Sequence, residues 1–389
     1  MSERLLLTFT GQDAPGITAE LSRTLAFFGA RLLDVEQVVI QGQLTLGFAV
    51  QLDDETRALE ELEAVARRLG LQLGQKKLLA VEPERERYAI TLIARALGPE
   101  ALHSVAAVLA GHHANIERIQ RLSEGGLASV ELAITLAPGT DAAELKRALL
   151  AEAGRGSFDC ALQRETLLRR AKRLVVMDMD STLIQIEVID ELAKAHGVGE
   201  QVSRITRRAM MGELDFDQSL QERVALLKGL DAQVLYVLAE NLPLTEGAET
   251  LLRVLKRLGY RTAVISGGFS AAAEALQRRL GIDHAWSNQL EIEGGRLTGR
   301  VVGTIVNAQR KADLLEELAA KEGVPLDQVI AIGDGANDLL MLQKAGHGIA
   351  FHAKPKLREA AHTAISAMGL DAILYLLGIT GREIASLEG

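Results

Sequence analysis

The sequence predicts an α/β fold in which a doubly wound, Rossmann-like parallel sheet with a helical insertion follows two small βαββαβ domains. Three observations predict it. The first 165 residues repeat one order of strands and helices, apolar strands alternate with helices from about Lys172 onward, and polar or glycine-rich groups follow those later strands. We place the domains at residues 1–82, 86–165 and 170–389, with the insertion at about 187–243.

The first repeat contains two helices and four strands. Leu21 and Leu25 lie four residues apart, which places them on one face of a helix that Gly29 ends. Gln41-Gly42-Gln43 joins two apolar runs and predicts a hairpin. We expect elements, in chain order, over residues 5–9, 17–28, 32–40, 44–52, 56–69 and 72–79.

The second repeat has the same order of elements, although its sequence identity to the first is weak. Gly98-Pro99 marks the turn after its first strand, and Glu124-Gly125-Gly126 separates two later strands. We expect elements over residues 88–93, 101–110, 116–122, 128–136 and 141–152. The order βαββαβ predicts a small ferredoxin-like sheet that helices cover on one side.

The third part of the chain has the pattern of a buried parallel sheet. Short, strongly apolar runs at residues 174–177, 262–265 and 329–332 each end at polar or glycine residues. Buried parallel strands have this pattern when their carboxyl ends hold a site. The insertion between the first two runs is polar and helical, and Pro243 and Gly247 mark the return to the sheet.

Composition excludes several classes of protein. The 389 residues are 48% hydrophobic and 24% charged with a net charge of -9, so there is no electrostatic case for nucleic acid or an anionic membrane. The short basic pairs Arg169-Arg170 and Lys172-Arg173 indicate a solvated face or the flank of a linker. No apolar stretch reaches about 18 residues, so no membrane span is expected, and the amino-terminal residues do not have the pattern of a signal peptide. Cys160 is the one cysteine, so no intramolecular disulfide can form. We therefore expect a cytoplasmic protein.

Four separated motifs indicate one site. They are Asp178-Met179-Asp180-Ser181-Thr182, Ser266-Gly267-Gly268, Lys311 and Gly333-Asp334-Gly335-Ala336-Asn337-Asp338. Each motif is a weak signal alone, and the last lacks the spacing and closing glutamate of a calcium loop. Together, in this order and close to apolar strands, they are hard to obtain by chance.

This set of motifs resembles that of the haloacid dehalogenase superfamily, over about residues 174–352. The resemblance implies phosphoryl transfer through a covalent intermediate on Asp178. A carboxylate that attacks a phosphate ester divides one difficult displacement into two easier ones. Asp180 lies two residues on, on the same side of an extended chain, and would protonate the leaving oxygen and then deprotonate water.

The same resemblance implies a Mg²⁺ cofactor. Its protein ligands would be the carboxylate of Asp178, the backbone carbonyl of Asp180 and Asp334, while Asp338 would orient the metal's surroundings. Because the substrate phosphate is doubly negative, its charge must also be offset by the protein.

Three further residues would hold the phosphate by resemblance. The Ser266 hydroxyl and the Gly267 N–H would bind its oxygens, and Lys311 would neutralise the charge that nucleophile and phosphate share. Lysines are usually solvated, but Lys311 lies between the second and fourth motifs, where the family has one cation.

The insertion narrows the resemblance to the phosphoserine phosphatases, which catalyse the last step of serine biosynthesis. Its matching segments are Glu187, residues 208–216 with Met210 and Phe216, and Ser219-Leu220 followed by Arg223-Val224. Glu187 would then pair with the ammonium of O-phosphoserine and Arg223 with its carboxylate, while the two apolar side chains cover the substrate.

Two positions outside the insertion complete this comparison. Asn337 would contact the substrate or its phosphate by resemblance. Met177, before the nucleophile, replaces the aromatic residue that relatives often have, and we expect it to pack into the sheet core without further consequence.

The two leading repeats resemble ACT domains, which commonly bind amino acids and often pair across subunits. Gly11-Gln12-Asp13-Ala14-Pro15-Gly16-Ile17 is similar to the ligand-loop signature, and the second copy is degenerate, with Leu97-Gly98-Pro99 at the corresponding turn. The resemblance implies a homodimer, with serine as a feedback ligand. The alternative is that the repeats only dimerise the enzyme.

Two other functions stay open from the sequence. A phosphotransferase would use the same intermediate and pass the phosphoryl group to an alcohol such as homoserine. A non-catalytic amino-acid sensor would tolerate the loss of a motif residue, yet all the motif residues are present.

Overall fold

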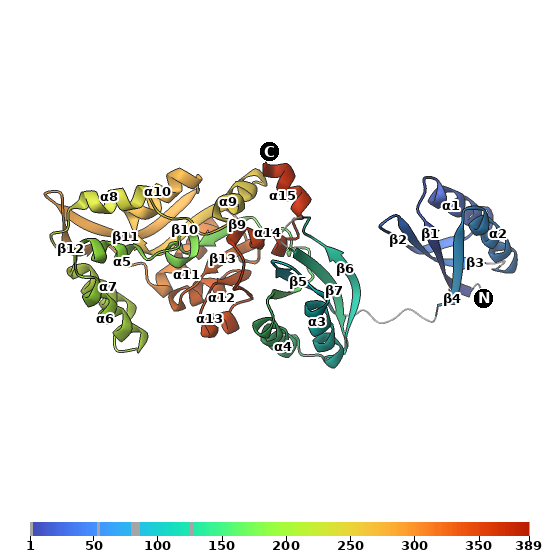
Figure 1. Ribbon diagram of the computed structural model, residues 1–389, viewed down its shortest axis with the longest axis horizontal. Coiled ribbons are helices and arrows are strands. Elements are labelled where there is room, and N and C mark those ends of the chain that lie inside the picture. The colour runs from blue at the N-terminus through green and yellow to red at the C-terminus, as the bar shows by residue number, and fades with distance from the viewer. Residues whose placement is uncertain (1–2, 53–54, 79–85, 125–127, 389) are drawn as a thin grey trace. The chain divides into compact units, whose positions relative to one another are not determined.

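The computed structural model describes residues 3–52, 55–78, 86–124 and 128–388 (Figure 1). The chain divides into two compact units, Met1–Glu84 and Arg85–Gly389. The second unit contains both the second repeat and the large parallel sheet. Within the described residues, no helix combines the length and the apolar character needed to cross a membrane.

The first unit is one four-stranded antiparallel sheet with two helices. Alternate residues of its central strand, Leu5, Leu7 and Phe9, are buried against those helices, as the alternating pattern predicts. Its strand order is β2-β3-β1-β4. Its elements are β1 (Glu3–Gln12), α1 (Ile17–Phe27), β2 (Arg31–Ile40), β3 (Gln43–Leu52), α2 (Glu55–Arg68) and β4 (Leu71–Lys77).

The second repeat folds in the same order, with strands β6-β7-β5-β8. The βαββαβ prediction is therefore confirmed for both copies. Leu79, at the end of the last strand expected in the first copy, and Gly125-Gly126 lie outside the described residues. The elements are β5 (Glu86–Ala94), α3 (Pro99–Gly111), β6 (Ala114–Arg121), β7 (Ala128–Leu136), α4 (Ala142–Arg155) and β8 (Asp159–Arg164).

The second repeat is docked on the catalytic sheet. Ile93, Leu122 and Ala161 belong to the same buried core as the helices of the large domain, and β8 contacts β15. The Asp159 carboxylate accepts hydrogen bonds from the backbone N–H groups of Ser366 at 2.9 Å and Ala367 at 3.2 Å. This part of the chain is therefore packed together by apolar burial and by hydrogen bonds from the backbone.

The interpretation of the basic pairs as a solvated face or linker flank is wrong for two residues. Arg169 and Lys172 are both buried. Arg169 forms an ion pair with the buried Glu131 of β7 at 2.6 Å. Charge runs in the sequence do not reveal such partners, because Glu131 lies 38 positions away and is brought near only by the docking.

The large sheet has seven strands in the order β12-β11-β10-β9-β13-β14-β15. Strands β11 to β15 in this order run parallel, and only β12 is antiparallel. The chain starts at β9 and winds outward on both sides, so β9 marks the topological switch point where α/β folds bind ligands. The strands are β9 (Leu174–Met177), β10 (Arg261–Phe269), β11 (His284–Glu293), β12 (Arg296–Val302), β13 (Val329–Gly333), β14 (His347–Phe351) and β15 (Thr363–Ile365).

Each face of this sheet has its own apolar core, and helices surround the sheet (Figure 1). Val175 and Met177 point to one core, and Leu174 and Val176 to the other. Met177 is fully buried, as predicted. The surrounding helices are α9 (Ala248–Arg257), α10 (Ser270–Leu280), α11 (Ala308–Lys321), α12 (Leu339–Lys344), α13 (Pro355–Ala360), α14 (Ile373–Leu376) and α15 (Gly381–Glu388).

The insertion is helical, as predicted, and forms a cap on the sheet. Its helices are α5 (Val188–Ala195), α6 (Gly199–Met210), α7 (Phe216–Ala225) and α8 (Ala232–Glu240). The chain leaves and returns through neighbouring backbone, since the Gln185 N–H donates to the Pro243 carbonyl at 3.0 Å. Gly247 then begins α9 with a left-handed φ of 79°, a conformation that glycine adopts without a steric penalty.

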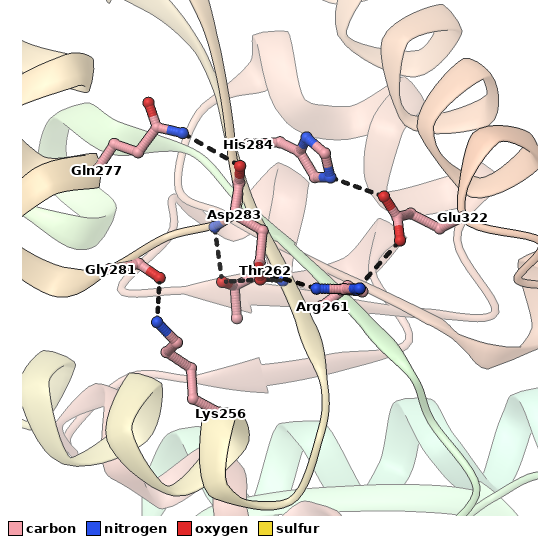
Figure 2. Close-up of polar contacts among 8 residues, drawn as sticks. All are labelled: Lys256, Arg261, Thr262, Gln277, Gly281, Asp283, His284 and Glu322. Atoms are coloured by element: carbon pink, nitrogen blue, oxygen red, sulfur yellow. Dashed lines mark hydrogen bonds and ion pairs between the residues drawn. The ribbon is translucent and has the colours of Figure 1, made fainter.

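A polar network fixes the amino end of β10, at the opposite edge of the sheet from the predicted motifs (Figure 2). One Asp283 oxygen accepts from the Thr262 N–H at 2.8 Å and hydroxyl at 2.9 Å. Arg261 pairs with Asp283 at 3.3 Å and Glu322 at 3.2 Å, and Glu322 also contacts His284 at 2.8 Å. These contacts tie β10, β11 and the end of α11 together.

Two details of the sheet differ from the sequence-based expectation. The strand expected at residues 262–265 continues to Phe269, so Ser266-Gly267-Gly268 lies within β10 rather than after it. Regular pairing with β11 is interrupted between Ile265 and Phe269, which frees this backbone for other contacts. The antiparallel hairpin of β11 and β12 was not expected.

Candidate active site

The predicted motifs meet at one cavity of about 550 Å³ between the sheet and the cap. Its walls come from the carboxyl ends of β9, β10 and β13 and from cap helices α6 and α7. Eight predicted site residues line it: Asp178, Asp180, Glu187, Arg223, Ser266, Gly267, Asp334 and Asn337. Lys311 and Asp338 lie behind this lining, where Lys311 contacts Asp178.

Asp178 lies where β9 ends. Its N–H donates to the Ile332 carbonyl of β13 at 2.9 Å, and its Oδ1 accepts from the Met179 N–H at 2.7 Å. Lys311 Nζ lies 2.8 Å from the same oxygen. The backbone bond to β13 fixes the position of Asp178, and the two contacts of its Oδ1 hold the side chain in one orientation at the cavity wall.

Lys311 is a fully buried ammonium group near the start of α11. Its Nζ contacts Asp178 Oδ1 at 2.8 Å and Asp338 Oδ1 at 2.7 Å. Burial lowers the pKa of a lysine, but the two carboxylates outweigh it and raise the pKa of Lys311 above the ordinary value. The group therefore stays charged beneath the nucleophile candidate.

Three carboxylates cluster behind the cavity. One oxygen each of Asp178, Asp334 and Asp338 lies within 4.8 Å of the others. Burial, with the charges of Asp178 and Asp338, raises the pKa of Asp334 to about 7. Burial and Asp178 raise the pKa of Asp338 to about 6, although Lys311 opposes them. One ammonium does not balance these charges, so the cluster fits a cation.

The oxygens of Asp338 are occupied by protein donors. Oδ1 accepts from Lys311, and Oδ2 accepts from the Gly335 N–H at 2.9 Å. Asp334 accepts a single bond, from the Thr182 hydroxyl at 3.2 Å, among the contacts of the described residues. Asp178 and Asp334 are therefore better placed than Asp338 to ligate an ion.

Asp180 is a buried carboxyl group facing the cavity. Its Oδ1 has no hydrogen-bond partner within the described part of the chain. Burial raises the pKa of Asp180 well above its ordinary value, and the charges of Glu187 and Asp178 add to this. A Cβ on Gly268 would lie 2.7 Å from Asp180 Oδ2, so glycine is required for the carboxyl group to approach β10.

The Ser266 segment presents donors to the cavity. Ser266 Oγ accepts from the Gly268 N–H at 2.9 Å, which leaves the hydroxyl proton free to donate elsewhere. Asn288 fixes this segment, because its Nδ2 donates to the Gly267 carbonyl at 2.8 Å while its Oδ1 accepts from the Val306 N–H at 2.8 Å. Asn288 was missed, since nothing in an apolar strand pattern distinguishes it.

Glu187 and Arg223 lie on the cap side of the same cavity. Glu187 accepts from the Ser181 hydroxyl at 2.8 Å, and Arg223 Nε donates to the Ser219 carbonyl at 3.2 Å. No ion pair within 4.0 Å joins Glu187 to Arg223 in the described structure, so the two opposite charges remain available to a ligand. Ser181, with a left-handed φ of 57°, was not predicted to position Glu187.

The cap is also held to the sheet directly. Asn307, before α11, donates to the Asp217 carboxylate of α7 at 3.1 Å. Phe216 lies close against Gly267, where an added Cβ would come within 2.7 Å of the ring. Met210 lines the cavity but remains 64% exposed, so it covers the opening only in part.

Three family models match the chain. A haloacid dehalogenase-like hydrolase model matches residues 172–346, and two ACT domain models match residues 3–76 and 87–163. These matches agree with the sheet and cap that hold the cavity and with the two small βαββαβ domains.

Known proteins match this chain over most of its length. The phosphoserine phosphatase of Streptomyces coelicolor is 46% identical over 99% of this chain and 94% of its own length. A solved haloacid dehalogenase family hydrolase of Salmonella enterica serovar Typhi is 32% identical with a TM-score of 0.67, covering 74% of this chain and 98% of its own.

A second solved protein is described as a phospho-aspartyl intermediate analogue of phosphoserine phosphatase. It is 45% identical with a TM-score of 0.50, covering 52% of this chain and 98% of its own. The chain belongs to the phosphoserine phosphatase family of haloacid dehalogenase-like hydrolases, with two ACT domains.

Proposed function

We propose that the protein hydrolyses O-phosphoserine to serine and phosphate through a phospho-aspartate on Asp178. The observation that carries this proposal is the pair Glu187 and Arg223, which face the same cavity as Asp178 without pairing with each other. A phosphorylated free amino acid supplies an ammonium for one and a carboxylate for the other.

The chemistry follows from the contacts of Asp178. Its carboxylate attacks phosphorus, and the bond from phosphorus to the serine oxygen breaks. Asp180, whose pKa is raised chiefly by burial, gives a proton to that oxygen and then takes one from the water that hydrolyses the acyl phosphate. The solved relative described as a phospho-aspartyl intermediate analogue supports this route.

The negative charge of the phosphate is offset from two directions. Lys311 lies 2.8 Å from the nucleophile, and the Ser266 hydroxyl and Gly267 N–H face the cavity from β10. Asn337 lines the same cavity and would contact substrate or phosphate. Groups held in place before the reaction stabilise transition-state charge without reorganising.

We infer that Mg²⁺ is the cofactor. Asp178, Asp334 and the backbone carbonyl of Asp180 would hold it, and Asp338, whose oxygens are already bonded, would orient them. The carboxylate cluster fits a hard divalent cation that prefers oxygen ligands. When bound, the ion supplies positive charge at the phosphoryl group.

Removal of the metal is expected to abolish turnover. Dialysis against EDTA should reduce phosphate release from O-phosphoserine by at least about 100-fold, because the carboxylates then repel the substrate dianion. Added Mg²⁺ should restore the rate and Ca²⁺ should not, since a larger ion with looser geometry fits the site poorly. Full activity after exhaustive chelation would contradict the assignment.

A product assay separates hydrolysis from phosphotransfer. With O-phosphoserine and Mg²⁺, we expect serine and inorganic phosphate in equal amounts, and the same amount of phosphate when homoserine is added. Conversion of homoserine to its phosphate ester at the expense of inorganic phosphate would favour the phosphotransferase. The sensor function is disfavoured, because every predicted catalytic residue lies at the cavity.

Three further proposals concern the whole protein. The ACT domains support amino-acid binding, with serine the expected ligand at Gly11–Ile17, and a homodimer. Dialysis of the full chain with labelled serine tests this, since a Gly16→Ala change, at a φ of 95°, should remove one bound serine if the loop binds it. A cytoplasmic location stays a prediction from the sequence.

A further inference from the structure

A second polar cavity, of about 420 Å³, lies between the second ACT domain and the catalytic domain. Helix α4 and strand β8 form one side, and the amino ends of β13 and β14 form the other. Four cationic side chains line it: Lys146, Arg164, Arg169 and Lys172. Asp327 is the single carboxylate among the described residues that line it.

The two arginines form ion pairs with carboxylates, but the two lysines do not, although the charge of Asp327 acts on Lys172 and partly offsets the effect of its burial. Arg164 pairs with Glu86 at 2.9 Å, and Arg169 pairs with Glu131 at 2.6 Å. Lys146 Nζ instead donates to the backbone carbonyl of Ala361, and Lys172 Nζ to that of Asp327 at 2.5 Å. Within the described residues, neither ammonium has a carboxylate oxygen within 4.0 Å.

Two neutral histidines complete the wall. His362 Nδ1 accepts from the Gly348 N–H at 2.8 Å, so its ring proton lies on Nε2, where it can be donated. His347 is buried, and its ring contacts Gln163 and Thr363. Burial lowers the pKa of both rings, and the charges of Lys146 and Lys172 lower it further.

The cavity therefore contains an excess of positive charge and hydrogen-bond donors. Burial also lowers the pKa of Lys146 and Lys172, which reflects the free-energy cost of holding their charges away from water. An anion between them would offset that cost and accept their remaining N–H groups. Asp327 offsets part of the charge of Lys172, and Lys146 has no carboxylate partner among the described residues, so positive charge remains in excess.

We propose that this cavity binds a phosphate dianion, held by Lys146 of the second ACT domain and by Lys172 and His362 at the catalytic domain. The bound group joins α4 to the segments before β9 and β15, so it strengthens the docking of the ACT domain. The site is separate from the catalytic cavity, which shares no lining residue with it. The phosphate can be the free ion or the head of a phosphomonoester.

Equilibrium dialysis of the full chain with Mg²⁺ and labelled inorganic phosphate tests the site. The wild-type chain should bind two phosphates, one in each cavity. The double variant Lys146→Gln/Lys172→Gln should bind one, or bind the second at least about tenfold more weakly, because it loses two charge-assisted hydrogen bonds. The control Arg147→Gln removes an exposed positive charge one residue along α4, outside this cavity, and should still bind two.

Activity and competition complete the experiment. The rate on O-phosphoserine should change less than about twofold in the double variant, which shows that the variant is folded. If the double variant does not fold, Lys146→Gln alone, at a half-buried position of α4, should weaken the binding of the second phosphate in the same way. The competition uses the Asp178→Asn chain, which does not hydrolyse the competitor. If phenyl phosphate displaces the labelled phosphate from the second cavity, the site takes phosphomonoesters. If only unlabelled inorganic phosphate displaces it, the site takes the free ion. Two phosphates bound equally tightly by wild type and double variant would overturn the proposal.

Discussion

Asp178→Asn is expected to lower the turnover of O-phosphoserine by at least about 10⁴-fold, because an amide cannot form the acyl phosphate. The substitution keeps the shape of the side chain and its contact with Met179 N–H, but it removes the negative charge beside Lys311. Phosphate release with saturating substrate and Mg²⁺ measures the loss.

The fold should survive this change. Asp178 contributes to the raised pKa values of Asp334 and Asp338, so in the metal-free chain its charge repels theirs. Loss of that repulsion opposes the loss of the ion pair with Lys311, so the melting temperature should stay close to that of the wild-type chain. Asp313→Asn, at a partly exposed carboxylate on the same α11 as Lys311 and outside the cavity, is the matched control and should keep full activity. Residual activity near a tenth of wild type would reject Asp178 as the nucleophile.

The sequence predicted those parts of the fold whose pattern is local. Val175 and Met177 alternate with Leu174 and Val176 between two cores, which is the signature of a strand covered on both faces. The antiparallel β12 was not foreseen, since nothing local in its sequence gives the direction of pairing. The docking of the second ACT domain was also missed, because the partners of Arg169 lie on other elements.

The sequence predicted most residues of the candidate site, but not the contacts that hold them in place. Asp178 and Asp334 directly follow apolar runs, so the topology of a parallel sheet brings them to one edge. The burial of Lys311 follows from no local signal, and only the family resemblance singled it out. Asn288 fixes the backbone of Gly267, and Gly268 leaves room for the side chain of Asp180. Both contacts join segments that are distant in the sequence, so a single sequence does not show them.

Arg223→Ala is expected to lower kcat/KM for O-phosphoserine by about 10- to 150-fold, the equivalent of a lost charge-assisted hydrogen bond or two. The loss should be less than about threefold for phenyl phosphate, which has no carboxylate. Both substrates are cleaved by the same Asp178, so the ratio of the two losses isolates the contact with the carboxylate. The contact within α7 from Arg223 to Ser219 is lost equally in both assays.

Two further variants sharpen this result. Arg223→Lys keeps the charge but loses the planar fork of donors, so its loss on O-phosphoserine should be intermediate. Arg204 is exposed on cap helix α6 and lies outside the cavity, so Arg204→Ala should leave kcat/KM unchanged for both substrates. Equal losses on both substrates with Arg223→Ala would show that the residue supports the cap or the phosphate rather than the carboxylate. The unpaired arrangement of Glu187 and Arg223 argues for the selective outcome, because each charge gains its full partner only when an amino acid is bound.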